Sequence, residues 1–203
     1  MERGVYKKSK LVYGVGVNDA NYVTQKYETV EGKRKQVWIC PFYRTWRSMI
    51  ERCYSEKWHS HHTYLDCVVC DEWLVFSNFK TWMEQQDWEG NHLDKDLLIR
   101  GNRVYSPSTS MFVHPKVNIF ITDHGKARGD YMIGVYWDKN AGKFKSQCCN
   151  PFTKKKEYLG YFTDEREGHL AWKNKKHEFA CMLAESEYVS DSRLVEVLKT
   201  LYL

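Results

Sequence analysis

The chain has 203 residues, a formal net charge of +5 at pH 7, and 42% hydrophobic and 15% aromatic residues. This length allows one large or two small domains that each bury a core, and the hydrophobic content excludes an intrinsically disordered protein. The seven cysteines, the lack of a signal-peptide core and the lack of an apolar run of ~18 residues lead us to expect a cytoplasmic protein with reduced thiols and no membrane partner. The mild positive charge favours anionic partners.

The first 36 residues carry two basic clusters on either side of a Gly-x-Gly segment at Gly14 and Gly16. The clusters are Lys7, Lys8 and Lys10, and Lys33, Arg34 and Lys35. A glycine pair without a third glycine is a weak signal for a phosphate-binding loop. We expect a strand or an ordered arm that ends in a turn.

Two helices are predicted from apolar residues that recur every three or four positions. The first begins at Pro41, since proline suits a first helical turn. Its apolar positions are Phe42, Trp46, Met49, Ile50 and Cys53. The second runs from Trp73 to Met83, and its apolar positions are Trp73, Phe76, Phe79 and Met83. We expect both apolar faces to be core rather than a cofactor site.

Between these helices, His59, His62, Cys67 and Cys70 are residue types that can bind zinc. Structural zinc sites usually join two ligand pairs that are a dozen or more residues apart, whereas His62 lies only five residues before Cys67. We therefore expect buried thiols on a short strand and no zinc.

Residues 92–118 read as a strand, a polar loop, a second strand and a short helix. Alternation between Leu93 and Ile99 predicts the first strand, and turn signals at Gly101-Asn102 and Ser106-Pro107 bound the loop. Residues 110–113 predict the second strand, and Pro115 can begin the helix.

This pattern resembles the ββα core of the HNH, or His-Me finger, nucleases of bacteriophages. The matching residues are Leu93-Asp94-Lys95, Tyr105-Ser106-Pro107, Phe112-Val113 and Asn118, and the resemblance extends over roughly residues 13–121. It implies that Asp94 and Asn118 bind a divalent metal such as Mg²⁺ and that position 95 holds the general base.

Lys95 stands at the base position, and a lysine amine, normally protonated at neutral pH, does not accept a proton from water. Thr109 stands where the family has an asparagine. These departures predict a degenerate nuclease core. One alternative is an active metal-dependent homing-type endonuclease in which Asp94, Asp96 or His92 replaces the usual base. The other is an ordinary structural hairpin with its charged residues in solvent.

The polar residues 122–131 contain two glycines and predict a linker between a domain at 1–121 and a second domain at 132–185. The second domain should contain strands at 133–139, 142–148 and 157–162. A helix should follow, with Asp164 and Glu167 as a capping box. A last helix is expected within 186–203, with Leu194, Leu198 and Leu201 on one face.

The order Gly134-Val135, Trp137-Asp138-Lys139, Gly142-Lys143-Phe144 and Leu159-Gly160 resembles the DNA-binding domain of plant ethylene-response factors and of phage relatives that accompany HNH cores. The resemblance implies a three-stranded antiparallel sheet that enters the major groove of double-stranded DNA while the helix packs behind it.

Strand alternation separates the two faces of this predicted sheet. Toward the helix we expect Val135, Trp137, Phe144, Ser146 and Cys148. Toward DNA we expect Tyr136, Lys143, Lys145, Gln147, Lys156 and Tyr158, with Lys139 and Lys154 beside them. Residues 139–156 contain six lysines and no acid, a pattern that suits phosphate contact. A solvated face that resists edge aggregation is the alternative.

The sequence thus predicts an α+β protein in which an HNH-like domain precedes a three-stranded sheet packed on one helix. We expect a DNA-binding protein with a degenerate nuclease core, and Mg²⁺ as cofactor if the core is active. If it is phage-encoded, it acts in the cytoplasm of the infected bacterium. A third alternative is an inhibitor of a host enzyme or defence system that uses the aromatic surface. The target sequence and the oligomeric state stay open.

Overall fold

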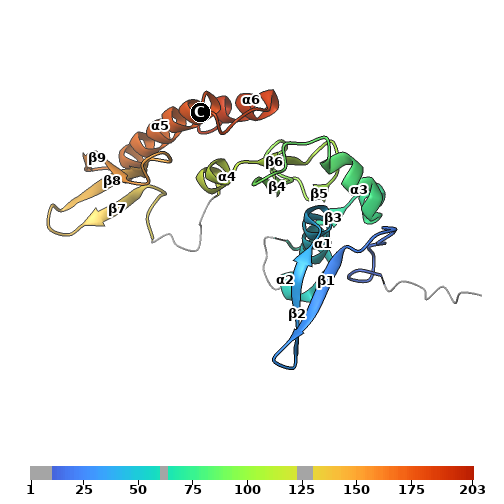
Figure 1. The fold of residues 1–203 in the computed structure, drawn as a ribbon. Coiled ribbons are helices and arrows are strands. Elements are labelled where there is room, and N and C mark those ends of the chain that lie inside the picture. Colours follow the sequence, from blue (N-terminus) through green and yellow to red (C-terminus); the bar gives the residue numbers. More distant parts are fainter. Residues whose placement is uncertain (1–10, 60–63, 123–129) are drawn as a thin grey trace, which may run out of the picture. The chain divides into compact units, whose positions relative to one another are not determined.

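The computed structural model describes residues 11–59, 64–122 and 130–203 and shows an α+β protein with small sheets. The chain forms two compact units, residues 1–112 and residues 113–203 (Figure 1). The sequence placed the domain boundary at 122–131, of which 123–129 lie outside the described residues. In the described part of the chain, no helix is long and apolar enough to cross a membrane.

The first unit contains short strands and helices. They are β1 (Gln25–Val30), β2 (Lys33–Ile39), α1 (Pro41–Tyr54), α2 (Glu56–His59), β3 (Val68–Val69), the 3-10 helix η1 (Asp71–Leu74), α3 (Phe76–Met83), β4 (His92–Asp94), β5 (Val104–Tyr105) and β6 (Met111–Val113), whose last residue begins the second unit. Three two-stranded sheets result: β1 pairs with β2 antiparallel, β3 pairs with β5 parallel, and β4 pairs with β6.

The core of the first unit forms between α1, η1 and α3. The fully buried Trp46 of α1 donates its indole N–H to the Trp73 carbonyl oxygen at 2.7 Å. Gly16 lies so close that a Cβ there would be 2.9 Å from the Trp46 ring. One large side chain therefore fixes both η1 and the segment that precedes β1.

The second unit is a three-stranded antiparallel sheet covered by helices. Its elements are α4 (Pro115–Ile121), β7 (Val135–Asp138), β8 (Lys143–Cys149), β9 (Lys156–Phe162), α5 (Glu165–Ala184) and α6 (Ser192–Thr200), and the strand order is β7-β8-β9. Asp164 begins α5 by accepting the Arg166 backbone N–H at 2.6 Å. Asp164 is the N-cap as predicted, although its carboxylate accepts the backbone N–H of Arg166 and not that of Glu167.

Helix α5 packs closely on one face of this sheet. The buried Ser146 hydroxyl of β8 donates to the Gly168 carbonyl oxygen in the first turns of α5 at 2.7 Å. Gly168 permits this approach, because a Cβ there would already be 3.3 Å from Val135. Buried Leu194 and Leu198 of α6 pack in turn against α5.

Two predictions for the first unit were wrong in extent. The helix expected from Trp73 to Met83 is interrupted at Val75, whose extended backbone caps η1 and precedes α3. The strand expected to reach Ile99 ends at Asp94. The Asp94 carboxylate accepts the backbone N–H groups of Asp96 and Leu97, at 3.0 and 2.8 Å, and this turns the chain away from the ladder.

Candidate nucleic-acid interface

Helix α5 leaves one face of the sheet β7-β8-β9 uncovered. On β8, Ser146 and Cys148 are buried on the side toward α5, so alternation places Lys145 and Gln147 on the opposite side. The register continues this face onto the neighbouring strands. We call it the outer face, and it consists of Tyr136, Asp138, Lys143, Lys145, Gln147, Cys149, Lys156, Tyr158 and Tyr161.

Every strand residue that the sequence assigned to DNA lies on this outer face. On the other face Val135 is buried as expected, and Trp137 packs its ring on Phe144 with ring centroids 4.9 Å apart. Trp137 nevertheless remains 39% exposed. Lys139 lies in the turn after β7, and Lys154 lies in the turn before β9 with a φ of 59°.

Tyr161 is an outer-face residue that alternation missed. The register shifts between Ser146 and Gln147, so that Ser146 pairs with Gly160, Gln147 pairs with Tyr158, and Leu159 is an extra residue in β9. Gly160 has a φ of 137°, which side-chain-bearing residues rarely adopt. The glycine inside the strand was the signal for this bulge.

Three tyrosines surround the Lys145 ammonium group at the centre of the outer face. Its Nζ lies 5.7 Å from the ring centroid of Tyr136, 5.6 Å from that of Tyr158 and 5.9 Å from that of Tyr161. Hydrogen bonding to Tyr136 is the largest cause that raises the pKa of Lys145. The three rings therefore surround this cation, and each tyrosine keeps more than a third of its surface exposed.

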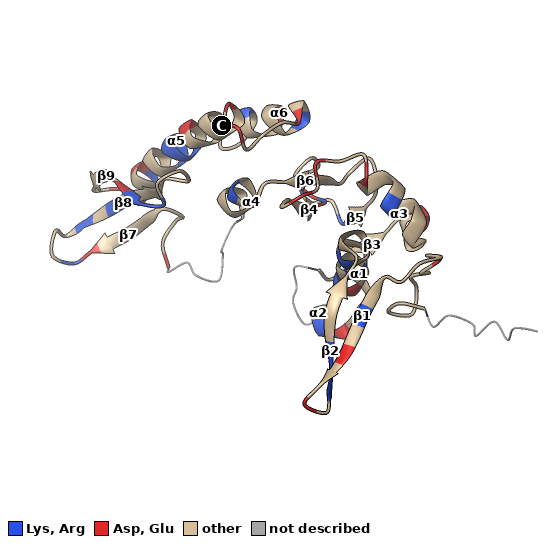
Figure 2. Cartoon of the chain, viewed as in Figure 1, with Lys and Arg blue, Asp and Glu red and all other residues tan. Residues whose placement is uncertain are grey.

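Positive charge dominates this part of the unit. Six lysines and no acid occur between residues 139 and 156, and Figure 2 shows basic residues along β8 and the start of β9. Asp138 is the acidic member of the outer face. Its carboxylate accepts the Tyr161 hydroxyl at 2.8 Å and the backbone N–H groups of Asn140 and Ala141. These bonds engage its oxygens within the sheet and lower the pKa of Asp138.

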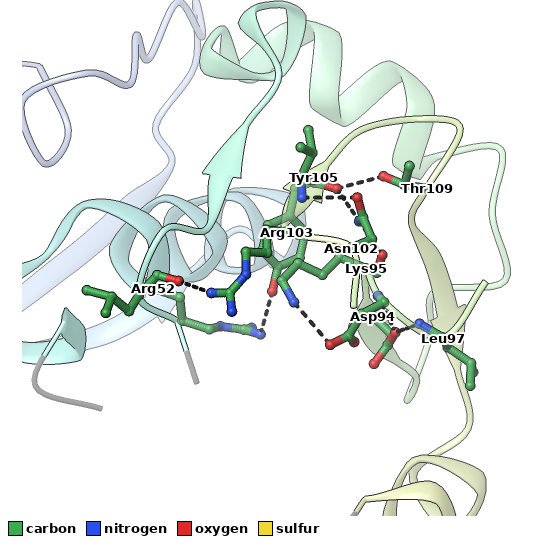
Figure 3. A network of polar contacts seen from close by, with 11 residues as sticks. Arg52, Asp94, Lys95, Leu97, Asn102, Arg103, Tyr105 and Thr109 are labelled. Carbon is green, nitrogen blue, oxygen red and sulfur yellow. Dashed lines mark hydrogen bonds and ion pairs between the residues drawn. The ribbon is translucent and has the colours of Figure 1, made fainter. Parts of the chain in front are cut away.

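The HNH-like positions of the first unit form a different kind of site (Figure 3). Burial, followed by the charge of Asp96, raises the pKa of the Asp94 carboxyl, whose Oδ1 accepts two backbone N–H groups. The Lys95 side chain is 7% exposed, and its Nζ lies 3.2 Å from Asp96 Oδ2 and 5.8 Å from the Tyr105 ring centroid. Position 95 thus holds a buried cation in an ion pair.

The surrounding loop is fixed by side chains that bond backbone oxygens. Asn102 donates to the carbonyl oxygens of Lys95 and Val104, at 2.6 and 2.8 Å, and Thr109 donates to Val104 at 2.7 Å (Figure 3). Arg52 of α1 donates to the Tyr105 hydroxyl at 3.4 Å. Thr109 therefore acts as a structural donor in this turn.

The residues described around Asp94 do not fit an Mg²⁺ site. Mg²⁺ requires several oxygen ligands in an octahedral arrangement. Here one oxygen of Asp94 already accepts two backbone N–H groups. The neighbouring carboxylate, that of Asp96, forms an ion pair with the Lys95 ammonium group. Within residues 11–59, 64–122 and 130–203, no three His, Cys, Asp or Glu side chains are grouped as metal ligands. His92 is exposed at the start of β4, and Asn118 belongs to the second unit.

Comparison with protein-family models, curated proteins and solved structures found no match to this chain.

The zinc prediction concerns a region that the structure describes in part. Cys67 is buried, and burial raises the pKa of the neighbouring Cys53 thiol to about 12, with Cys67 as the next cause. His62 lies outside the described residues, so the expected lack of zinc stays a prediction.

Proposed function

We propose that this chain is a DNA-binding protein whose second unit contacts duplex DNA through the outer face of β7-β8-β9. One observation carries the proposal. The outer face combines three lysines with three tyrosines, and its acidic residue, Asp138, is bonded within the sheet. Affinity for duplex DNA comes mainly from cations that neutralise phosphates, and a solvated sheet does not require this charge asymmetry.

The dimensions of the sheet suit the DNA major groove. That groove is about 12 Å wide and admits neighbouring β-strands, whose spacing is about 4.8 Å. Gln147 lies on the outer face between Lys145 and the end of β8, and glutamine can pair with adenine. The outer face has no arginine, the usual reader of guanine. We therefore propose binding that depends chiefly on the DNA backbone, with limited sequence preference.

The order of strands and helix supports the resemblance to ethylene-response-factor domains. Three antiparallel strands precede α5, which packs on the face opposite the lysines. From the same resemblance we propose that the chain is a phage-type DNA-binding protein that carries an HNH-like region. We propose that this region is degenerate here, because the buried Lys95, paired with the exposed Asp96, stands where the general base belongs.

The test measures binding of the full chain to a fluorescent duplex of about 20 base pairs. If the outer face covers ~4 phosphates, affinity falls roughly a hundredfold between 50 and 200 mM salt. The triple variant Lys143→Ala, Lys145→Ala, Lys156→Ala should weaken binding at least tenfold on unrelated sequences. A matched control removes three cations from the helices, namely Arg166→Ala, Lys173→Ala, Lys199→Ala. Equal affinity of the two triple variants would refute the assignment of the interface to the outer face.

A further inference from the structure

The hairpin of β1 and β2 extends from the first unit with both of its faces in solvent (Figure 1). Every residue from Lys26 to Trp38 is exposed, and Tyr27, Val37 and Trp38 each keep more than 40% of their surface accessible. An isolated two-stranded hairpin is only marginally stable in water. A fully exposed hairpin of this length therefore needs features that hold its shape.

The hairpin is held at both of its ends. At the tip, Glu31 and Gly32 have φ values of 53° and 72°, as a tight two-residue turn between antiparallel strands requires. At the base, Thr24 and Cys40 are buried, and the Cys40 N–H donates to the Thr24 carbonyl oxygen at 2.9 Å. Pro41 then begins α1. The hairpin is thus a defined arm attached to the core.

The two faces of the arm differ in their chemistry. On one face, Gln25 accepts hydrogen bonds from Tyr27 and Gln36 at 2.7 and 3.0 Å, and the Arg34 guanidinium lies 4.1 Å from the Tyr27 ring centroid. These contacts stabilise the hairpin internally. The opposite face carries Lys26, Glu28, Val30, Lys33, Lys35 and Trp38 by alternation, and we call it the lysine face.

The lysine face presents cations that the described part of the protein does not neutralise. The ammonium groups of Lys33 and Lys35 make no hydrogen bond or ion pair with any residue that the structure describes. Lys26 lies 5.6 Å from the Trp38 ring centroid, which leaves its charge in place. The arm as a whole has four basic and two acidic side chains.

We infer that the β1–β2 arm is a second contact with duplex DNA, with its lysine face toward the phosphates. A two-stranded ribbon fits the major groove, and its lysines release counterions when they meet phosphates. A protein partner suits this surface less well, because protein interfaces are depleted in lysine and glutamate at their centre. The inference rests on the proposed function, since it adds a second protein surface that contacts the same duplex DNA.

Two DNA contacts in one chain make the second contact intramolecular once the first has formed. Loss of either surface should therefore weaken binding strongly without abolishing it. Each lysine that contacts a phosphate contributes about 0.9 to the slope of log affinity against log salt concentration. Three lysines of the arm should contribute a slope of roughly 2.7.

The deciding experiment titrates full-length protein into the same labelled duplex at several salt concentrations. The variant Lys26→Gln, Lys33→Gln, Lys35→Gln should bind at least tenfold more weakly at 100 mM salt and show the lower slope. Its control, Arg44→Gln, Lys57→Gln, Arg100→Gln, removes three exposed cations elsewhere in the first unit. Glu28→Gln removes the acidic residue of the lysine face and should tighten DNA binding several-fold. Because this variant is expected to gain affinity, its result does not depend on whether the triple variant folds correctly.

The outcomes separate the two proposals. Weakening by the arm variant, with tightening by Glu28→Gln, supports the arm. Wild-type affinity in both arm variants overturns the arm contact, even if the outer-face triple variant still weakens binding. If the arm triple variant binds DNA more weakly and the outer-face triple variant keeps wild-type affinity, the arm contact is supported and the outer-face assignment is refuted. Wild-type protein that does not bind duplex DNA overturns both.

Discussion

The Tyr161 hydroxyl donates to the Asp138 carboxylate at 2.8 Å and joins the two edge strands of the sheet across β8. This bond is the largest cause that lowers the pKa of Asp138 and raises the pKa of Tyr161. The carboxylate is therefore charged at every pH near neutrality, directly beside the lysines of the outer face. A structural anion is thus part of the surface proposed to contact DNA.

Asp138→Asn should tighten duplex binding by about two- to fivefold, because it removes a negative charge that faces the phosphates. Asparagine keeps an oxygen that can accept the Asn140 and Ala141 N–H groups, so the turn should persist. The measurement is anisotropy of a labelled duplex at 50 mM salt. Glu196→Gln, an exposed change on α6, is the control and should leave affinity unchanged. Weaker binding by Asp138→Asn would contradict DNA contact at this end of the outer face.

Gly134→Ala should destabilise the second unit far more than Gly142→Ala. Both glycines have positive φ, at 84° and 61°, so each substitution strains the backbone by about 1 kcal/mol. At Gly134 a Cβ would also lie 2.1 Å from Trp172, whereas nothing lies within 4 Å of a Cβ at Gly142. Overpacking adds roughly 1–3 kcal/mol.

Urea unfolding of the full chain, followed by circular dichroism, gives the free energy of unfolding for both glycine variants. Equal decreases in the free energy of unfolding of the two variants would show that the close approach of Trp172 to Gly134 is absent in solution. A larger loss in Gly142→Ala would contradict the backbone conformation of that turn.

The strands of the second unit were predictable because their residues alternate and glycines mark their ends. The outer face followed from that alternation as far as Tyr158. Tyr161 could not be assigned in this way, because the bulge at Leu159 and Gly160 reverses the alternation within one strand. Alternation alone does not reveal where a ladder loses its register; here the signal was the glycine inside the strand.

In the first unit, tertiary contacts and side-chain bonds overrode the local pattern. The apolar period from Trp73 to Met83 continues through Val75, but the bond from Trp46 to the Trp73 carbonyl oxygen fixes η1 as a separate turn. The alternation after Leu93 likewise continues, but Asp94 bonds the following backbone and ends the strand. The burial of Lys95 also depends on a non-local contact, because its ammonium group lies 5.8 Å from the ring centroid of the buried Tyr105.

Asp94→Asn should stabilise the protein at neutral pH. Burial raises the pKa of Asp94 in the folded state, so the folded chain holds this proton more tightly than the unfolded chain. Stability then falls as pH rises from the ordinary carboxyl pKa of about 4 toward the raised value. Asparagine does not ionise, and its oxygen can still accept the N–H groups of Asp96 and Leu97.

Thermal unfolding of the Asp94 variant should show a higher midpoint than wild type at pH 7 and an equal midpoint near pH 3. Asp87→Asn, at an exposed position of the same unit, serves as the control and should show no such pH-dependent difference. A lower midpoint for Asp94→Asn at pH 7 would mean that the ionised carboxylate stabilises this loop, contrary to the effect of its burial.

Wild-type protein should bind supercoiled plasmid without nicking it in Mg²⁺ or Mn²⁺. General-base catalysis contributes about 10²- to 10⁴-fold, and the Lys95 ammonium, paired with Asp96 at 3.2 Å, does not supply it. Asp94 offers a carboxylate that is already bonded to two backbone N–H groups. The measurement is conversion of supercoiled to open-circular plasmid by wild type and Asp94→Ala at equal concentration. Metal-dependent nicking by wild type that Asp94→Ala abolishes would establish a working nuclease and end the degenerate-core proposal.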